Sequence, residues 1–558
     1  MNIYRLTSTI LLSLLMMAMT RASANDISVT SAHAIANEFI KQHSTNAPGT
    51  FKSPAAADIK LAHAEPSSKV EGSNVYYAFN IDGGGFIIVA GDDRASLVLG
   101  YSDKGRIDFS HLPDPLEGLL EHYKYDIEYL QTHHLDNSQL AIRNTLKDEA
   151  PEVIVEPMTT STWGQENPYN LQCPVYNDKY SRVGCSGICM SQIIYFWKYP
   201  ESFGPYPAYY NSKAGQDVPE LPETTLDYSK MLDAYCHWDW DLSMPVQDVF
   251  NDDQVQEAAK LCRYVGQAAQ MSYSSSVTIA YIPTVFDVMK DLGYNHNAKY
   301  MKMAYYSTES WEEKIRNELN VSRPVMYTAF SQNNSVGHSY VIDGYDSEGF
   351  FHINMGWYGT NDGWYVMSAV TLVNRYGEYH DYSHNAIMFT GIEPPAFCTL
   401  KAADINLASG LVVLGGSLHP VAHSVNLYTS YRELDLMFTL TDADGQTVAT
   451  GEPRRVIRHR FVQGCDIDLP MTLPAELAPG TYDLNFGYSV AGDDNPLVNV
   501  ETAQGKLVVF GKFAKYNAGF DIEDIIQVIQ YVLNGDGANS GVSVDITDVT
   551  ELIEHILK

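Results

Sequence analysis

One segment of the chain has the composition of a helix that is buried on all sides. It begins after Gly184 and ends at Pro200, and its residues from Ile188 to Trp197 are apolar nearly all round a helical projection. A helix without a polar face must be covered by other elements, and proline cannot continue helical backbone. The chain must therefore build at least one layered globular domain around this segment. Of the residues of the whole chain, 45% are apolar and 19% are charged, so there are enough apolar side chains to form ordinary hydrophobic cores.

Length, charge and cysteine content narrow the class of protein. A chain of 558 residues predicts several domains. The 36 Lys and Arg against 68 Asp and Glu give a formal charge of −32, which disfavours nucleic-acid binding. Seven Cys are too few for a disulfide-built scaffold, and no Cys-x-x-Cys pairs indicate zinc. We expect neither a metal nor an organic cofactor.

The first 24 residues have the features of a secretory signal peptide. Arg5 supplies a positive start, an apolar run follows from Ile10 to Met19, and Ala22-Ser23-Ala24 offers a small-residue cleavage site. A membrane anchor would need about 20 continuous apolar residues, and this run is about half as long. We therefore expect an exported protein, either secreted or held in the periplasm or at the cell surface, without a membrane span.

Four further regions follow the signal peptide. Residues 25–150 indicate a small α+β unit, with helices at 31–41 and 116–130 and strands at 74–80 and 86–90. Residues 131–157 are polar and aperiodic, which is typical of an exposed, cleavable linker. Residues 151–395 are rich in Tyr, Trp and Gly. Short alternating stretches between turns predict a β-sandwich at 396–511, and residues 512–558 form a helical repeat.

Cys185 is placed where a thiol becomes reactive. It stands at the start of the apolar helix, where unpaired backbone N–H groups and the positive end of the helix dipole stabilise a thiolate. The same N–H groups can hold a developing oxyanion. The alternative is an inert, buried structural cysteine, which is the commoner fate of a single Cys.

Three polar residues elsewhere in the chain complete a cysteine-nucleophile constellation. His338 opens an apolar strand and is the candidate base. Asn354 lies on the next strand, where an amide oxygen can orient the imidazole ring. Gln165, twenty residues before Cys185, can donate to an oxyanion. Each has a structural alternative, namely a backbone-satisfied His, a strand Asn outside the required register, and a surface-loop Gln.

These motifs together resemble one family. The pieces are Trp163-Gly-Gln165-x-x-Pro-Tyr-Asn, Gly184-Cys185 with Gln192 seven residues on, Gly337-His338, and His352-Ile-Asn354-x-Gly-Trp357. They resemble the streptopain/interpain family of secreted bacterial cysteine peptidases. The resemblance implies an α+β, papain-like catalytic domain of two subdomains over residues 151–395. It also implies Cys185 as nucleophile, His338 as base and acid, Gln165 as oxyanion donor and Asn354 as the group orienting His338, with Gly337, Met355 and Trp357 along the substrate cleft.

The preceding unit also resembles a part of that family. Residues 84–94 and 98–102 are similar to its inhibitory propeptide. The resemblance implies a zymogen, whose own propeptide blocks the cleft until it is cut off. We expect that cut within residues 131–157, and we expect protein or peptide substrates for the enzyme.

The chain departs from the family at two places. Met355 stands where the family usually has Trp, and Ser186-Gly-Ile-Cys189 replaces Val-Ala-Thr-Ala after the nucleophile. Cys189, one helical turn below Cys185, is expected to be a packed thiol, with a redox partner as the minor alternative.

These departures leave two other functions open. One is a catalytically impaired relative that acts as an extracellular binding protein, and the other is an acyl transferase on the same dyad.

The last region contains a repeat with a period of 24 residues, from Asp521 to Leu533 and from Asp545 to Leu557. It resembles a degenerate dockerin, in which calcium loops precede each Asp-x-x-Asp. Few oxygen ligands remain at the expected positions, which include Lys515, so we expect no calcium. A two-helix structural tail and a module that docks onto a protein partner remain equal alternatives.

Overall fold

A computed structural model describes residues 25–44, 51, 59–133, 152–294, 298–330, 337–370, 386–395, 398–407, 411–429, 433–457, 464–490, 498–516, 520–534 and 542–558. The predicted signal peptide and most of the predicted linker lie outside these residues. The chain divides into two compact units, residues 1–393 and 394–558, which are described separately. Over the described ranges, no helix has the length and hydropathy of a bilayer span.

The described residues of the N-terminal part of the first unit form two helices and four strands. The predicted helices and strands are present, with each helix two or three residues longer at its ends. The extra turn at the start of the second helix comes from Pro115, since proline is well accommodated in the first turn of a helix. The elements are α2 (Val29–Ser44), β1 (Ile59–Pro66), β2 (Asn74–Ile81), β3 (Phe86–Ala90), β4 (Val98–Ser102) and α3 (Asp114–Thr132).

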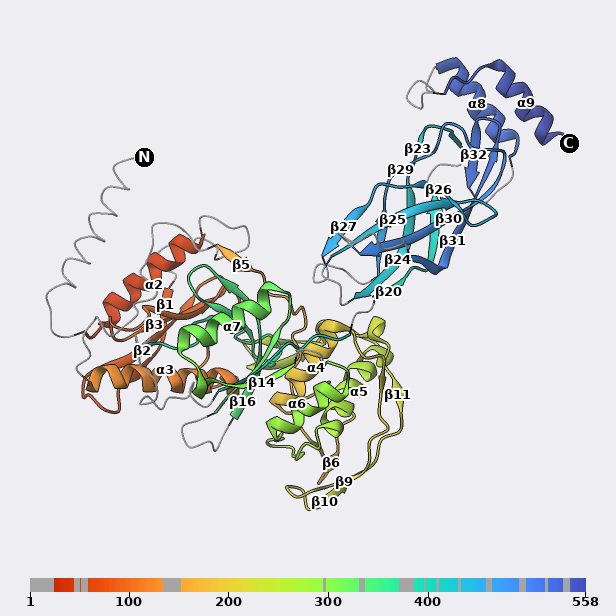
Figure 1. The fold of residues 1–558 in the computed structure, drawn as a ribbon. Coiled ribbons are helices and arrows are strands. Elements are labelled where there is room, and N and C mark those ends of the chain that lie inside the picture. Colours follow the sequence, from red (N-terminus) through yellow and green to blue (C-terminus); the bar gives the residue numbers. More distant parts are fainter. Residues whose placement is uncertain are drawn as a thin grey trace, which may run out of the picture. The chain divides into compact units, whose positions relative to one another are not determined.

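The described residues of the rest of the first unit form four α-helices and the strands that carry the predicted site (Figure 1). The helices are α4 (Cys185–Trp197), α5 (Asp252–Ala268), α6 (Ile282–Asp291) and α7 (Thr308–Asn320). The main strands are β5 (Val153–Val155), β14 (Lys299–Lys302), β15 (Val325–Phe330), β16 (Gly337–Asp346), β17 (Phe351–Asn354), β18 (Gly363–Tyr365) and β19 (Ile387–Thr390). Short hairpins pair β6 (Val175–Tyr176) with β7 (Lys179–Tyr180), β9 (Tyr209–Asn211) with β10 (Gln216–Val218), β11 (Thr224–Thr225) with β8 (Ser202–Phe203), and β12 (Cys236–Asp239) with β13 (Met244–Gln247).

One sheet runs through both parts of this unit. Its order is β1-β2-β3-β4-β18-β17-β16-β15-β19-β14, with β5 paired to β16. A linker without regular structure was expected over residues 131–157. This expectation is wrong for Val153–Val155, which form a strand of this sheet. The run of three apolar residues there, Val153-Ile-Val155, is too short to predict a strand from the sequence.

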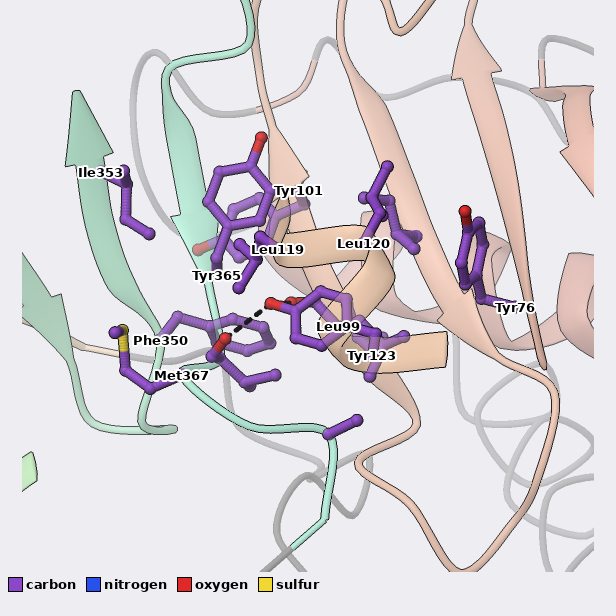
Figure 2. Close-up of a cluster of buried hydrophobic side chains, with 14 of the residues drawn as sticks. Tyr76, Leu99, Tyr101, Leu119, Leu120, Tyr123, Phe350, Ile353, Tyr365 and Met367 are labelled. Carbon is purple, nitrogen blue, oxygen red and sulfur yellow. Dashed lines mark hydrogen bonds between the residues drawn. The ribbon is translucent and has the colours of Figure 1, made fainter. Parts of the chain in front are cut away.

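The junction within the sheet lies between β4 and β18. Trp364 pairs with Tyr101, and Tyr365 pairs with Gly100. Aromatic and aliphatic side chains from both sides form a common core beside this junction (Figure 2). In this core the Tyr123 hydroxyl of α3 donates to the carbonyl of Val366 at 2.6 Å. The N-terminal region and the region after it thus share one sheet and one hydrophobic core.

Several helices pack on this sheet, and three of them, α3, α4 and α7, contact the strand that carries His338. Helix α4 packs against β15 and β16, as does α7, whereas α2 packs on β1, β2 and β3. Helix α3 contacts β2 and also reaches β16, the strand that carries His338. The start of α3 therefore approaches the residues for which the sequence predicts catalytic roles.

The second unit is built from antiparallel strands and two helices. One sheet joins β24 (Pro420–Thr429) to β20 (Cys398–Lys401), β21 (Asp404–Leu407) and β28 (Cys465–Asp468). The other has the order β22-β32-β31-β30-β25-β26, with β27 paired to β25, and its inward residues join those of the first sheet in one apolar cluster. Its strands are β22 (Leu411–Val413), β25 (Glu433–Thr441), β26 (Thr447–Thr450), β27 (Arg454–Ile457), β30 (Gly480–Val490), β31 (Val498–Phe510) and β32 (Phe513–Tyr516), and β23 (Ser417–Leu418) pairs separately with β29 (Met471–Thr472).

The C-terminal repeat forms helices α8 (Ile522–Asn534) and α9 (Ile546–Ile556), which share a small apolar cluster with β22 and Phe513. The two aspartates of the dockerin-like motif bind lysines. Lys515 Nζ lies 2.9 Å from Asp524 Oδ2, and Lys512 Nζ lies 3.1 Å from Asp548 Oδ2. An ammonium group therefore pairs with the second aspartate of each Asp-x-x-Asp motif.

The close approach at the junction gives a first prediction. A Cβ on Gly100 would lie 2.3 Å from the Tyr365 ring, which is far inside van der Waals contact. Gly100→Ala should cost about 1–3 kcal/mol through overpacking and quicken amide exchange in β4 by about tenfold or more. Hydrogen exchange of the full chain, carrying Cys185→Ala to prevent self-cleavage, measures this effect. Gly480→Ala is the control, because a Cβ there meets no atom within 4 Å, and unchanged exchange in β4 would contradict the prediction.

Candidate active site

Cys185 is the first residue of helix α4, as the sequence predicts. Gly184 precedes it with φ +85°, a backbone conformation that favours glycine and turns the chain sharply into the helix. The Cys185 side chain is half-buried, and its Sγ lies 3.9 Å from the carbonyl oxygen of Gly337. Cys189, one turn on, is buried and free. The nucleophile candidate thus lies at a helix N-terminus, directly against the residue that precedes His338.

Two buried hydroxyls connect the helix to the strand that carries His338. Ser186 Oγ lies 2.9 Å from Ser339 Oγ, and Ser339 Oγ lies 2.8 Å from Thr328 Oγ1 on β15. Because Ser186 follows Cys185 and Ser339 follows His338, this contact holds together the two chain segments that carry the predicted catalytic residues. The sequence analysis missed Ser339 and Thr328, and the only signal was a serine directly after each predicted catalytic residue.

The surroundings shift the pKa values of the two predicted catalytic residues in the directions that favour their neutral forms. Burial raises the pKa of the Cys185 thiol, although the Ser339 N–H and the Ser186 hydroxyl and N–H act in the opposite direction. Burial lowers the pKa of His338. The carboxylate of Asp114, the first residue of α3, acts to raise the pKa of both groups. The N-terminal region therefore places a negative charge beside the dyad, which no sequence motif indicated.

Gln165 is placed near the nucleophile by its main chain. Its carbonyl accepts the N–H of Val183 at 2.8 Å, two residues before Cys185. The side chain is buried, with 5% of its residue surface exposed. This excludes the alternative of an exposed surface-loop glutamine, and the role of its amide as an oxyanion donor stays a prediction.

Asn354 has different partners from the predicted one. It stands opposite Val341 in the β16–β17 pairing, three residues along the strand from His338. Its Oδ1 accepts from Gln192 Nε2 at 3.1 Å, and its Nδ2 donates to the Ser161 carbonyl at 2.6 Å. In this structure Asn354 thus fixes helix α4 to β17, and its role in orienting His338 stays a prediction.

The three predicted cleft residues occupy different environments. The carbonyl of Gly337 faces the Cys185 thiol, as described above. Trp357 is half-buried, with the Arg182 guanidinium 5.8 Å from its ring centroid. Met355 is 1% exposed and belongs to the large apolar core, and its N–H donates to Asp362 Oδ1 at 2.8 Å. Of the three, Gly337 lies against the thiol and Met355 is enclosed by core residues.

A histidine–carboxylate pair that the sequence did not indicate joins β17 to β16. His352 Nδ1 is 2.6 Å from Asp343 Oδ1, and Asp343 Oδ2 accepts the N–H of Thr159 at 2.8 Å. Asp343 is fully buried, so these contacts satisfy a buried charge and link β16, β17 and the start of the enzyme region. Among the described residues, no group of three or more His, Cys, Asp or Glu side chains could hold a metal ion.

Comparison with known proteins agrees with this geometry. Residues 163–365 match the Peptidase C10 family, and residues 24–127 match the Spi protease inhibitor family. Streptopain of Streptococcus pyogenes is 28% identical over 332 residues, which cover 57% of this chain and 79% of streptopain. The thiol protease/hemagglutinin PrtT of Porphyromonas gingivalis is 25% identical over 407 residues, covering 69% of this chain and 44% of that protein.

A solved structure of prointerpain A from Prevotella intermedia is also similar to this chain. It has a TM-score of 0.46 and 22% identity, and the match covers 59% of this chain and 98% of that one. The two family matches coincide with the region that holds the predicted dyad and with the region that packs α3 against it. The chain thus matches the Peptidase C10 family over residues 163–365, and it is a cysteine peptidase made as a zymogen with its own inhibitor domain in front.

Proposed function

We propose that this peptidase is an exported endopeptidase that works through Cys185 and His338. The contact of Cys185 Sγ with the Gly337 carbonyl is the observation that carries this assignment, because it sets the thiol beside the residue preceding His338. Export is inferred from the signal-like residues 1–24. The papain-like two-subdomain arrangement, the β-sandwich over 396–511 and a docking partner for the C-terminal tail stay predictions.

The proposed reaction follows from the placement of these groups. The Cys185 thiolate attacks the peptide carbonyl, and the N–H at the start of α4 together with the Gln165 amide holds the oxyanion. His338 takes the thiol proton and gives it to the leaving amine, and a thioester forms between Cys185 and the acyl part of the substrate. His338 then removes a proton from water, which hydrolyses the thioester and returns the free thiol.

The N-terminal domain supports a mechanism of inhibition. Helix α3 contacts β16, and the Asp114 carboxylate raises the pKa of the Cys185 thiol. We infer that Asp114 opposes thiolate formation as long as the inhibitor domain shares the sheet through β4 and β18. Processing is proposed upstream of Val153, because a peptide bond within a paired strand is a poor substrate for proteolysis.

Self-processing tests the proposed function directly. The chain from Asn25 onward, with Cys185 intact, should lose its N-terminal domain by a cut within residues 131–152. The Cys185→Ala form should persist as the full precursor. Gel electrophoresis and mass determination of purified, protease-free samples measure the outcome. Equal trimming of both forms would count against Cys185 as the nucleophile, and products formed with an added amine would separate acyl transfer from hydrolysis.

The role of Gln165 gives a further prediction. Gln165→Ala in the processed enzyme should lower kcat by about 100- to 1,000-fold, with little change in KM, as for removal of an oxyanion donor. Gln172→Ala is the matched control, since the Gln172 side chain binds Gln256 instead. Steady-state hydrolysis of a peptide substrate measures both constants, and an equal loss in the two variants would contradict the assignment.

The charge of Asp114 can be tested in the uncut chain. In a His338→Ala background, which prevents self-cleavage, Asp114→Asn should make iodoacetamide label Cys185 about threefold faster near neutral pH, because a nearby negative charge disfavours the thiolate. Glu121→Gln on the same helix is the control, since Glu121 is exposed and its charge acts on Glu117 and Tyr76. Labelling that stays the same with Asp114→Asn would remove Asp114 from the inhibitory mechanism.

A further inference from the structure

A pocket of about 310 Å³ lies where strand β5 joins the sheet. Its lining residues include Ile154, Arg316, Asp346, Ser347 and Glu348. Asp346 is the last residue of β16 and is paired with Val153 of β5. The described chain of the peptidase region begins directly before this pair, at Glu152. The pocket therefore borders the point at which the predicted linker enters the sheet.

Only one of the two carboxylate oxygens of Asp346 has hydrogen-bond partners. Its Oδ1 accepts the N–H groups of Glu348 and Phe350, at 3.0 and 2.9 Å, and so forms the turn after β16. Its Oδ2 is buried and has no hydrogen-bond partner among the described residues. The whole residue is 2% exposed. A buried, unpaired carboxylate costs free energy, and buried charges in proteins are normally paired.

The turn alone does not explain an aspartate at this position. An asparagine would offer the same single oxygen to both N–H groups and would bury no charge. Burial raises the pKa of Asp346 to about 7, and the charge of Glu348 acts in the same direction. The guanidinium of Arg316 lies on the pocket wall, but it binds Glu312 at 2.8 Å. On β4, burial and then the charge of Asp346 raise the pKa of Tyr101, so that hydroxyl is neutral.

Processing brings a cation to this pocket. Hydrolysis of a peptide bond releases a new α-amino group, whose ordinary pKa of about 7.7–8.0 keeps most of it protonated at neutral pH. The proposed cut lies upstream of Val153, the residue that pairs with Asp346. In the uncut chain the N–H of Glu152 donates to the Oγ of Ser347, a pocket residue, at 3.0 Å. Strand β5 therefore holds the new chain end at the pocket.

We propose that this pocket binds the α-amino group created by processing, with the Asp346 carboxylate as its ionic partner. The proposal rests on the proposed cut upstream of Val153, whichever protease makes it. The ion pair forms only after the cut, because the same nitrogen atom is an uncharged amide in the uncut chain. It fixes β5 to the end of β16, whose other end carries His338. The pair thus stabilises the processed enzyme and not its precursor.

The test uses the full chain with Cys185→Ala, in which the recognition sequence of a specific protease replaces residues 148–151. Cutting by that protease leaves Glu152 as the first residue. A succinimidyl ester is added at pH 7, where α-amino groups react in preference to lysines, and peptide mass spectrometry measures the label on Glu152. The α-amino group should react about tenfold more slowly in the cut parent than in cut Asp346→Asn, because an ion pair that raises its pKa by about one unit leaves about a tenth of the free amine.

A second measurement compares thermal stability at pH 8, at a protein concentration that keeps the inhibitor domain bound. Asp346→Asn should raise the Tm of the uncut form by about 2–4 °C, because it removes a buried unpaired charge. It should lower the Tm of the cut form by a similar amount, because it leaves the ammonium group unpaired. Asp362→Asn is the matched control, since burial raises the pKa of Asp362 to about 7 as well and Asp362 lies outside the pocket. It should shift the Tm of both forms alike and leave the labelling rate unchanged.

The outcomes separate this proposal from the peptidase mechanism. Equal labelling of Glu152 in the parent and in Asp346→Asn, or a Tm change of the same sign in both forms, would overturn the amino-group site. If Asp346→Asn does not fold, the parent decides alone, because an α-amino group that reacts as fast in the folded cut protein as in denaturant would also overturn the site. Since an added protease makes the cut, none of these results depends on Cys185, whose role the self-processing test decides.

Discussion

The site depends on how helix α4 is held against the sheet. The helix is apolar on nearly every side, so burial alone would allow it to slide or rotate on strands β15 and β16 with little loss of contact. Two polar pairs remove that freedom, Ser186 with Ser339 near its start and Gln192 with Asn354 two turns later. Buried polar pairs of this kind fix one arrangement, because any shift leaves both partners unsatisfied. The position of Cys185 relative to His338 follows from them.

The inhibitor domain uses the same sheet that carries the site. Its strand β4 continues the order of strands at β18, and its aromatic and aliphatic side chains enter the core of the peptidase. This common core fixes α3 relative to β16, so that Asp114 is held beside the dyad by the fold as a whole. In the proposed mechanism, inhibition depends on this packed surface and on the charge of Asp114 at the start of α3.

The elements of this fold could largely be predicted from the sequence, and so could part of the site. The helix at Cys185, both helices of the inhibitor domain and the turn after Asp346 follow from apolar periodicity and from turn residues. The pairing of β4 with β18 could not be foreseen, since two paired residues far apart in the chain leave no periodic signal.

The sequence predicts which residues belong to the site more readily than it predicts the contacts that each of them makes. Asn354 is predicted to orient His338, and this stays a prediction; the sequence could not show its partners Gln192 and Ser161, because strand register, which sets Asn354 opposite Val341, decides what its side chain reaches. Ser186 was noticed only as a departure from a family pattern, because the sequence does not show that Ser339 lies against it. In the sequence, Lys515 occupies a position at which a calcium loop would have an oxygen ligand. In the structure, its ammonium group forms an ion pair with Asp524.

The continuous sheet has a consequence for the timing of activation. Hydrolysis upstream of Val153 would separate the chain into two pieces, yet it would leave the β4–β18 pairing and the aromatic core of Figure 2 untouched. The severed inhibitor would then behave as a tightly bound partner, governed by mass action. At high protein concentration the cut enzyme would therefore remain inhibited. Activation would begin only when dilution lets the cleaved inhibitor domain dissociate, or when proteolysis degrades it.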